Sequence, residues 1–180
     1  MSVSILSVRL SKYIMAEFEL IEINPQQDAV LRQLGQFYFY DFSEIEGDWV
    51  DENGRFTEIN TERFWTLPGA RAFLCRVDGH WAGFAMISQR SFLVDVPQAN
   101  VVEEFFVMRQ YRRRGVGIGM ANRLFDLVSG EWHLAQTPNN DKARKFWHQV
   151  VRQRTEEPVE EHQLDDDLWV GTLQRMWVKR

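Results

Sequence analysis

The stretch QYRRRGVGIGMA, residues 110–121, combines the densest cluster of arginines in the chain with closely spaced glycines. Residues 112–114 are arginines, and Gly115, Gly117 and Gly119 follow at every second position, in a chain whose net charge is −5. An apolar run precedes the stretch and an amphipathic run follows it, so we interpret it as a turn from a strand into a helix. Glycines at such a turn leave main-chain N–H groups accessible, and arginines add permanently charged donors. The stretch therefore predicts a phosphate-binding site.

Other phosphate-binding patterns fit this stretch less well. A Walker loop needs a lysine and a Ser or Thr after its last glycine, whereas Met120 and Ala121 follow Gly119. A dinucleotide fingerprint needs GxGxxG after the first strand, whereas this chain has GxGxG after a late one. One arginine cluster in an acidic protein is a weak footprint for nucleic acid, so we expect no nucleic-acid partner. A solvated basic turn with glycines for tight packing is the plain alternative.

Length and composition bound the class of protein. The chain of 180 residues has the size and composition of one globular domain. We predict a single domain over residues 15–180 and a flexible tail over residues 1–14. No apolar run reaches about 18 residues, so we expect no membrane association through a spanning helix. The single cysteine, Cys75, cannot form an internal disulfide, which fits a cytoplasmic protein.

Turn signals and periodicity predict the order β α (α) β β β α β α β β. Asp78-Gly79 lies between two apolar runs and indicates a hairpin, because both turn residues must take positive φ. The first helix follows Asn24 and is expected to end near Asp41, and the acidic residues 41–54 are expected to form a loop. A short helix is expected around 61–66, and two longer ones after residue 117 and after Asn139 or Asn140. The expected strands are 18–23, 71–77, 80–87, 101–107, 131–136 and two within 153–178. This order predicts an α/β sheet covered by helices.

The arginine–glycine stretch resembles the acetyl-CoA motif of the GNAT N-acetyltransferase superfamily. That motif reads Q/R-x-x-G-x-G/A and follows a strand that ends in valine. In this chain Val107 ends the apolar run, Arg112 takes the Q/R place, and Gly115 and Gly117 take the two glycine places.

A second motif of the same family, N-x-x-A-x-x-F-Y, matches residues 140–147, except that Trp147 replaces the tyrosine. The strong match covers about 101–151. The resemblance implies a mixed, mostly antiparallel sheet of six or seven strands with helices on both faces. The W-x-G-x-x-Q run that begins at Trp169 also resembles an uncharacterised bacterial subgroup of GNAT proteins.

The resemblance implies acetyl-CoA as co-substrate and no metal. Main-chain N–H groups near the start of the mid-chain helix would hold the diphosphate, and the three arginines would face the phosphates. Pantetheine would lie along the motif strand like an additional strand. The residues that we expect to bind the co-substrate are Phe106, Val107, Met108, Arg112, Arg113, Arg114, Gly115, Val116, Gly117, Ile118, Gly119, Asn140, Lys142, Ala143 and Trp147.

The resemblance also implies attack of an amine on the thioester, which requires a general base because amines are mostly protonated at neutral pH. Many family members use a carboxylate on the motif strand. The candidate catalytic residues are Glu103, which takes the family's usual acidic position, and Glu104. Side chains alternate along a strand, so we expect at most one of them to enter the cleft.

Trp147 departs from the family, whose tyrosine at this place is proposed to protonate the departing thiolate. An indole N–H is not a usable proton source. Three outcomes are open: the thiolate leaves unaided, another residue such as His148, His133 or Tyr111 donates the proton, or the protein binds acyl-CoA without efficient turnover. Trp147 also fits a plain role in the core.

The favoured function is acetyl-CoA-dependent N-acetylation of a small amine. The acidic segments 41–52 and 156–167 would attract a cationic acceptor, or they are simply solvated loops. The alternative is a non-catalytic acyl-CoA-binding regulatory module, and a third is an interaction domain with a vestigial motif. Trp169 and Trp177 near the end of the chain would suit a homodimer.

Overall fold

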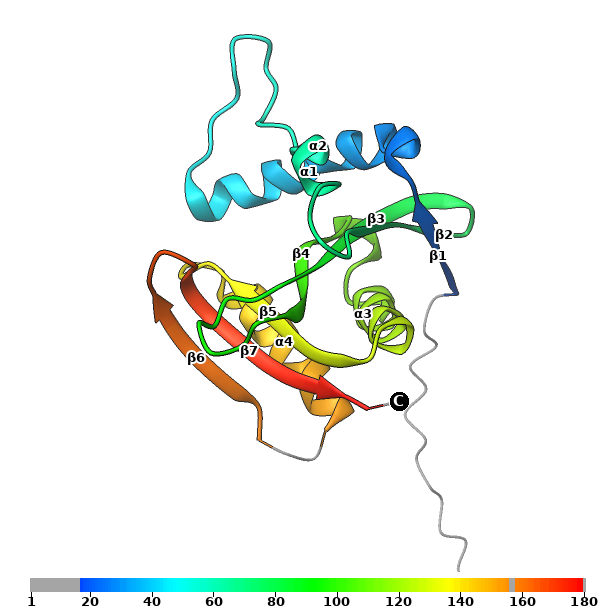
Figure 1. Ribbon diagram of the computed structural model, residues 1–180. Helices are drawn as coiled ribbons and strands as arrows, with labels where there is room; N and C mark the ends of the chain where they lie inside the picture. Colours follow the sequence, from blue (N-terminus) through cyan, green and yellow to red (C-terminus); the bar gives the residue numbers. More distant parts are fainter. Residues whose placement is uncertain (1–16, 156–157, 180) are drawn as a thin grey trace, which may run out of the picture.

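One seven-stranded sheet organises the chain, which the computed structural model describes over residues 17–155 and 158–179 (Figure 1). The order across the sheet is β1-β2-β3-β4-β5-β7-β6. Every neighbouring pair is antiparallel except β4 with β5, which is parallel, so the predicted mixed, mostly antiparallel sheet is confirmed. The flexible tail expected at 1–14 lies outside the described residues. The strands are β1 (Phe18–Ile23), β2 (Arg71–Val77), β3 (His80–Arg90), β4 (Ala99–Val107), β5 (Gly130–Gln136), β6 (Glu160–Asp165) and β7 (Val170–Val178).

Helices cover both faces of the sheet, as expected. The helices are α1 (Ala29–Glu46), α2 (Thr61–Phe64), α3 (Val116–Leu127) and α4 (Asp141–Arg154). Alternate residues of β2 divide between two cores: Leu74 packs in the core beneath α1 and α2, and Phe73 packs in the core that holds α3 and α4. No described helix is long and apolar enough to cross a membrane.

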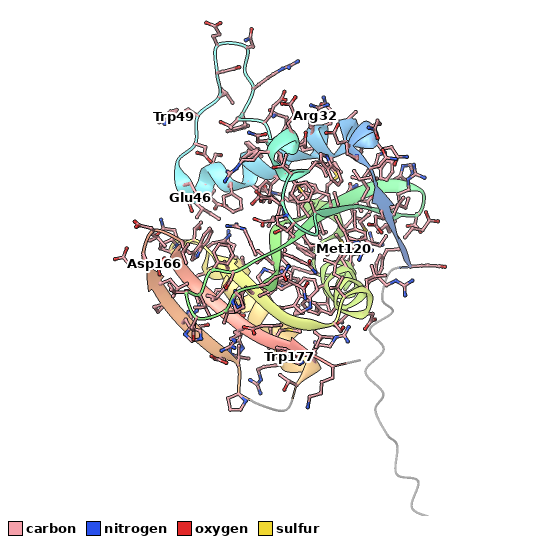
Figure 2. The ribbon with its side chains drawn as sticks, viewed as in Figure 1. Arg32, Glu46, Trp49, Met120, Asp166 and Trp177 are labelled. Atoms are coloured by element: carbon pink, nitrogen blue, oxygen red, sulfur yellow. The ribbon has the colours of Figure 1, made fainter. Side chains whose placement is uncertain are left out.

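Helix α1 is longer than predicted, because it continues from Asp41 to Glu46. It ends at Gly47, whose φ of 76° is left-handed and whose N–H donates to the Ser43 carbonyl at 3.2 Å. This glycine is the first stop signal after the apolar positions of the helix. The prediction of a loop was therefore wrong for residues 41–46, and the protruding segment begins only after Glu46 (Figure 2).

The predicted hairpin is confirmed, since Asp78 and Gly79 have φ of 51° and 75°. The next connection is shorter than expected, because Arg90 still pairs with Ala99 across β3 and β4.

The parallel pair β4–β5 joins the strands over only two positions. Asn100 pairs with Trp132 and Val101 with His133. Beyond them β4 runs on to Val107 without a partner in β5. The backbone of β4 therefore presents an open edge at its carboxyl end.

Candidate active site

A cavity of about 800 Å³ lies along the open half of β4, between the end of α1 and the first turns of α3 and α4. The structure brings eleven of the residues expected to bind the co-substrate together in its lining: Phe106, Val107, Arg112, Arg113, Gly115, Gly117, Ile118, Asn140, Lys142, Ala143 and Trp147. These residues come from β4, α3 and α4, so the two sequence motifs meet at one cavity.

The amino end of α3 presents unpaired main-chain donors at this cavity. Gly119 N–H donates to the Gly115 carbonyl at 2.9 Å, and this is the first hydrogen bond of the helix. The N–H groups of residues 115–118 therefore have no acceptor within α3. Gly115 has φ of 82° and Arg113 has φ of 61°, so the chain turns sharply into the helix. Such a turn and helix end suit an anion.

Two glycines of the motif have different roles. A side chain at Gly117 would enter the space beside Phe146 and Val107, with its Cβ 3.3 Å from the Phe146 ring. At Gly119 a Cβ would lie 2.4 Å from the ring of Phe18 in β1. Gly117 therefore keeps the cavity open, whereas Gly119 lets α3 pack on the sheet.

Four residues expected to bind the co-substrate lie outside the cavity lining. Val116 is buried in the core, and Gly119 packs on Phe18. Met108 N–H donates to the Ala82 carbonyl at 2.8 Å. The Arg114 guanidinium lies over the Tyr111 ring. The main chain of the arginine–glycine turn thus lines the cavity more fully than its side chains do.

An aspartate from α1 binds two arginines of the turn. The carboxylate of Asp41 pairs with Arg109 at 2.7 Å and with Arg112. Arg112 also donates to the Val107 carbonyl at 2.6 Å. Arg112 thus joins α1 to the end of β4, and Arg113 is the motif arginine that lines the cavity without an ion pair among the described residues.

The end of α1 also reaches the opposite wall of the cavity. Glu44 pairs with Lys142 at 3.3 Å, and Glu46 accepts a hydrogen bond of 2.6 Å from the Thr137 hydroxyl (Figure 2 labels Glu46). Together with Asp41, these side chains place α1 across the mouth of the site. Sequence reasoning missed this wall, although the spacing of Tyr38, Phe42 and Ile45 was a helical signal.

The second motif shapes the floor of the cavity. Asn140 caps α4, since its side-chain oxygen accepts from Ala143 N–H at 3.1 Å. Trp147 is 5% exposed and its ring lies 5.0 Å from those of Phe105 and Phe146. The tryptophan thus combines a packing role in the core with a place in the lining.

A bulge in β4 changes where the two candidate carboxylates point. Met86 of β3 pairs with Glu104 and the next residue, Ile87, pairs with Val102, so Glu103 is the extra residue. Glu103 accepts hydrogen bonds from the Ser88 hydroxyl and, at 2.7 Å, from the Arg90 guanidinium. Glu104 lies opposite Met86, which packs in the α1 core.

The alternation expected along β4 therefore breaks at the bulge. Ser88 is two residues beyond Met86 and lies on the same face of β3. Both carboxylates consequently lie on the α1 side of the sheet, but neither Glu103 nor Glu104 is among the residues that line the cavity.

The two carboxylates differ in their surroundings. Burial raises the pKa of Glu104 to about 7, with a smaller contribution from the charge of Glu103, while a side-chain hydrogen bond from Tyr38 acts in the opposite direction. Glu103 is held in its bidentate pair with Arg90. The carboxyl group of Glu104 is thus poised to exchange a proton near neutral pH.

The raised pKa of Glu104 predicts a pH-dependent stability. The unfolded chain has the ordinary carboxyl pKa of 4.5, so the folded protein holds an additional proton between pH 4.5 and about 7. The stabilisation is complete below pH 4.5 and is lost as pH rises through 7. A Glu104→Gln variant should therefore gain stability relative to wild type between pH 5 and 8, by up to about 3 kcal/mol.

Urea unfolding at several pH values measures this difference. Glu52→Gln, on the exposed protruding segment, controls for the loss of one negative charge. A constant difference between wild type and Glu104→Gln across this range would contradict the assigned environment of Glu104.

A family model described as the acetyltransferase (GNAT) family matches residues 31–150 of the chain. This range contains α1, the open edge of β4, the arginine–glycine turn and most of α4. No curated protein sequence matches the chain at a significant level. Among residues 17–155 and 158–179, no group of three His, Cys, Asp or Glu side chains could hold a metal ion.

Solved structures share the fold at low sequence identity. An acetyltransferase from Thermus thermophilus has a TM-score of 0.63 and 14% identity, over 89% of this chain and 96% of its own. A spermidine N-acetyltransferase from Vibrio cholerae, in complex with CoA and spermine, has a TM-score of 0.55 and 13% identity, over 89% of this chain and 94% of its own. The aminoglycoside N-acetyltransferase AAC(6')-Iy, in complex with CoA, has a TM-score of 0.51 and 19% identity, over 80% of this chain and 93% of its own.

Proposed function

Because the chain belongs to the GNAT acetyltransferase family, we propose that it transfers the acetyl group of acetyl-CoA to the amino group of a small acceptor. One observation carries the proposal. A single cavity has unpaired N–H groups of α3 at one wall, and Tyr38, which is close enough to the Glu104 carboxyl to shift its pKa, lines another. The first arrangement suits phosphates and the second suits removal of a proton.

The residues of the cavity fit CoA. The N–H groups of residues 115–118 and the side chain of Arg113 would hold the diphosphate. The absent side chain at Gly117 leaves room beside them. The open edge of β4, at Phe106 and Val107, offers backbone groups to pantetheine. When bound, acetyl-CoA supplies the activated acetyl group.

Glu104 would serve as the general base through a bridging water, because its carboxyl group does not line the cavity itself. A base works best when its pKa lies near the working pH, and burial gives Glu104 such a pKa. Glu103 would instead hold Arg90 and, by its charge, raise the proton affinity of Glu104. Glu104 would therefore be the base, although Glu103 takes the usual acidic position of the family.

The acceptor would be recognised by more than the charge of the acidic segments. Asp41, Glu44, Glu160 and Glu161 are already paired with arginine, lysine or histidine side chains. Residues 156–157 lie outside the described residues. The complex of the spermidine N-acetyltransferase with CoA and spermine supports a small amine acceptor. The ion pairs of these carboxylates argue against capture of the acceptor by charge alone.

Release of free thiol from acetyl-CoA tests the proposal. Purified protein would be incubated with acetyl-CoA and a panel that contains polyamines, aminoglycosides, amino sugars and basic peptides. We expect release with at least one amine above the rate without amine. Tight CoA binding without release across the panel would favour the non-catalytic acyl-CoA-binding module instead, an alternative that the missing tyrosine at Trp147 motivates.

A further inference from the structure

Tyr38 of α1 presents a phenol to the cavity. Among the described residues that line it, Tyr38 is the side chain with a hydroxyl group. Its ring is held edge-on against Phe84 and Phe106, with centroids 5.9 Å apart in both pairs, and lies 4.6 Å from the Phe42 ring. Aromatic packing on several sides fixes the direction of the hydroxyl.

The Tyr38 ring packs on Phe106, which is two residues from Glu104 along β4, and Tyr38 and Glu104 each shift the pKa of the other. Burial raises the pKa of Tyr38 well above its usual value, and the charges of Glu104 and Glu46 add to this effect. Tyr38 is therefore fully protonated at neutral pH, beside a carboxyl group that can hold a second proton.

We propose that Tyr38 is the proton donor to the departing sulfur, in place of the tyrosine that the family has where this chain has Trp147. The inference rests on the proposed acetyl transfer and deepens it. Tyr38 lines the same cavity as Trp147 and Val107, but it comes from α1, on the other side of the motif strand. It thus restores a phenol to the site from a different element of the fold.

The proton that the amine loses reaches sulfur through Glu104 and Tyr38. In the transfer a C–N bond forms, the thioester C–S bond breaks, and one proton passes from the amine nitrogen to sulfur. Glu104 takes the proton from nitrogen at a carboxylate oxygen through a bridging water, since Glu104 does not itself line the cavity. Tyr38 gives its hydroxyl proton to sulfur as it receives the proton of Glu104, so no free phenolate accumulates. The net transfer of a proton from Glu104 to sulfur is favourable, because a thiol has a pKa of about 8.5 and Glu104 has one of about 7.

The other candidate donors lie elsewhere. His133 is fully buried, binds Glu131 at 3.0 Å and accepts from Phe92 N–H at 3.3 Å. The ring of Tyr111 is buried beneath Arg114. Neither of them lines the cavity, nor does His148.

Titration of the thiol of bound CoA tests the donor without an acceptor amine. A hydroxyl that donates to sulfur stabilises the thiolate, so Tyr38→Phe should lower the ionisation constant of the bound thiol by roughly tenfold or more. Ultraviolet absorption of the thiolate measures this in wild type, Tyr38→Phe and Tyr40→Phe. Tyr40 lies on the same helix, is 58% exposed and serves as the matched control.

The outcomes separate the two proposals. If wild type does not bind CoA, the proposed function fails. If CoA binds and the thiol ionises equally in wild type and Tyr38→Phe, the function stands and the role of Tyr38 is wrong.

Kinetics with the fastest amine of the panel give a second readout. Tyr38→Phe keeps the ring packing, and we expect kcat to fall on the order of 100-fold with little change in KM for acetyl-CoA. The loss should persist at alkaline pH, and the Tyr38→Phe/Glu104→Gln double variant should be no slower than Glu104→Gln, because both residues act on one proton. A loss that disappears at alkaline pH would show that Tyr38 only positions Glu104 and would overturn the proposal.

Discussion

A Glu104→Gln variant will acetylate the fastest amine of the panel about 100- to 1,000-fold more slowly than wild type, with unchanged affinity for CoA. The amide has nearly the shape of the carboxyl group but cannot accept the proton of the amine. In wild type, kcat/KM should rise with pH through about 7, because the base works in its ionised form and burial places its pKa there. In the variant this rising limb should be absent. Steady-state rates of thiol release between pH 5.5 and 9 measure both effects.

Glu103→Gln is the matched control, since it neutralises the adjacent carboxylate on the same side of the sheet. It breaks the pair with Arg90 but leaves both Tyr38 and Glu104 unchanged. We expect this variant to keep most of its rate. A loss in Glu103→Gln that equals or exceeds that of Glu104→Gln would return the role of the base to Glu103, the residue that the sequence motif ranks first.

A Gly117→Trp variant will lose CoA binding, with a dissociation constant raised on the order of 100-fold or more. The Cβ of a residue at 117 points beside Phe146 and Val107, so an indole there would fill the cavity. The same substitution places the ring in front of the free N–H groups of α3. Calorimetric titration with CoA measures the affinity, and circular dichroism checks that the fold is retained.

Gly117→Ala provides the graded control. Its single methyl group would stand 3.3 Å from the Phe146 ring and 3.6 Å from Val107, so a shift of a few tenths of an ångström accommodates it. We expect a reduction in affinity of less than about tenfold. Wild-type affinity in Gly117→Trp would show that CoA does not use this cavity.

The features that the sequence predicts well are local. Asp78-Gly79 fixes a hairpin through two adjacent residues that tolerate positive φ. Gly115 marks the strand-to-helix turn in the same way, with φ of 82°. The two family motifs identify the walls formed by α3 and α4, because each lies within a few consecutive residues of one element.

The features that the sequence does not reveal depend on long-range contacts. Asp41 meets Arg112 across 71 residues of chain, so nothing near either residue indicates the pair. The bulge at Glu103 arises from the register between β3 and β4, which residue types alone do not set. The position of Tyr38 near Glu104 depends on the packing of α1 against β4 and on this bulge. Residue patterns alone therefore do not distinguish the surroundings of the two carboxylates.

A crystal structure with CoA would show whether the amino end of α3 holds the diphosphate. We expect diphosphate oxygens at about 3 Å from the main-chain nitrogens of residues 115–118, with pantetheine along the open edge of β4. A diphosphate bound elsewhere on the protein, with these N–H groups facing only water, would contradict it.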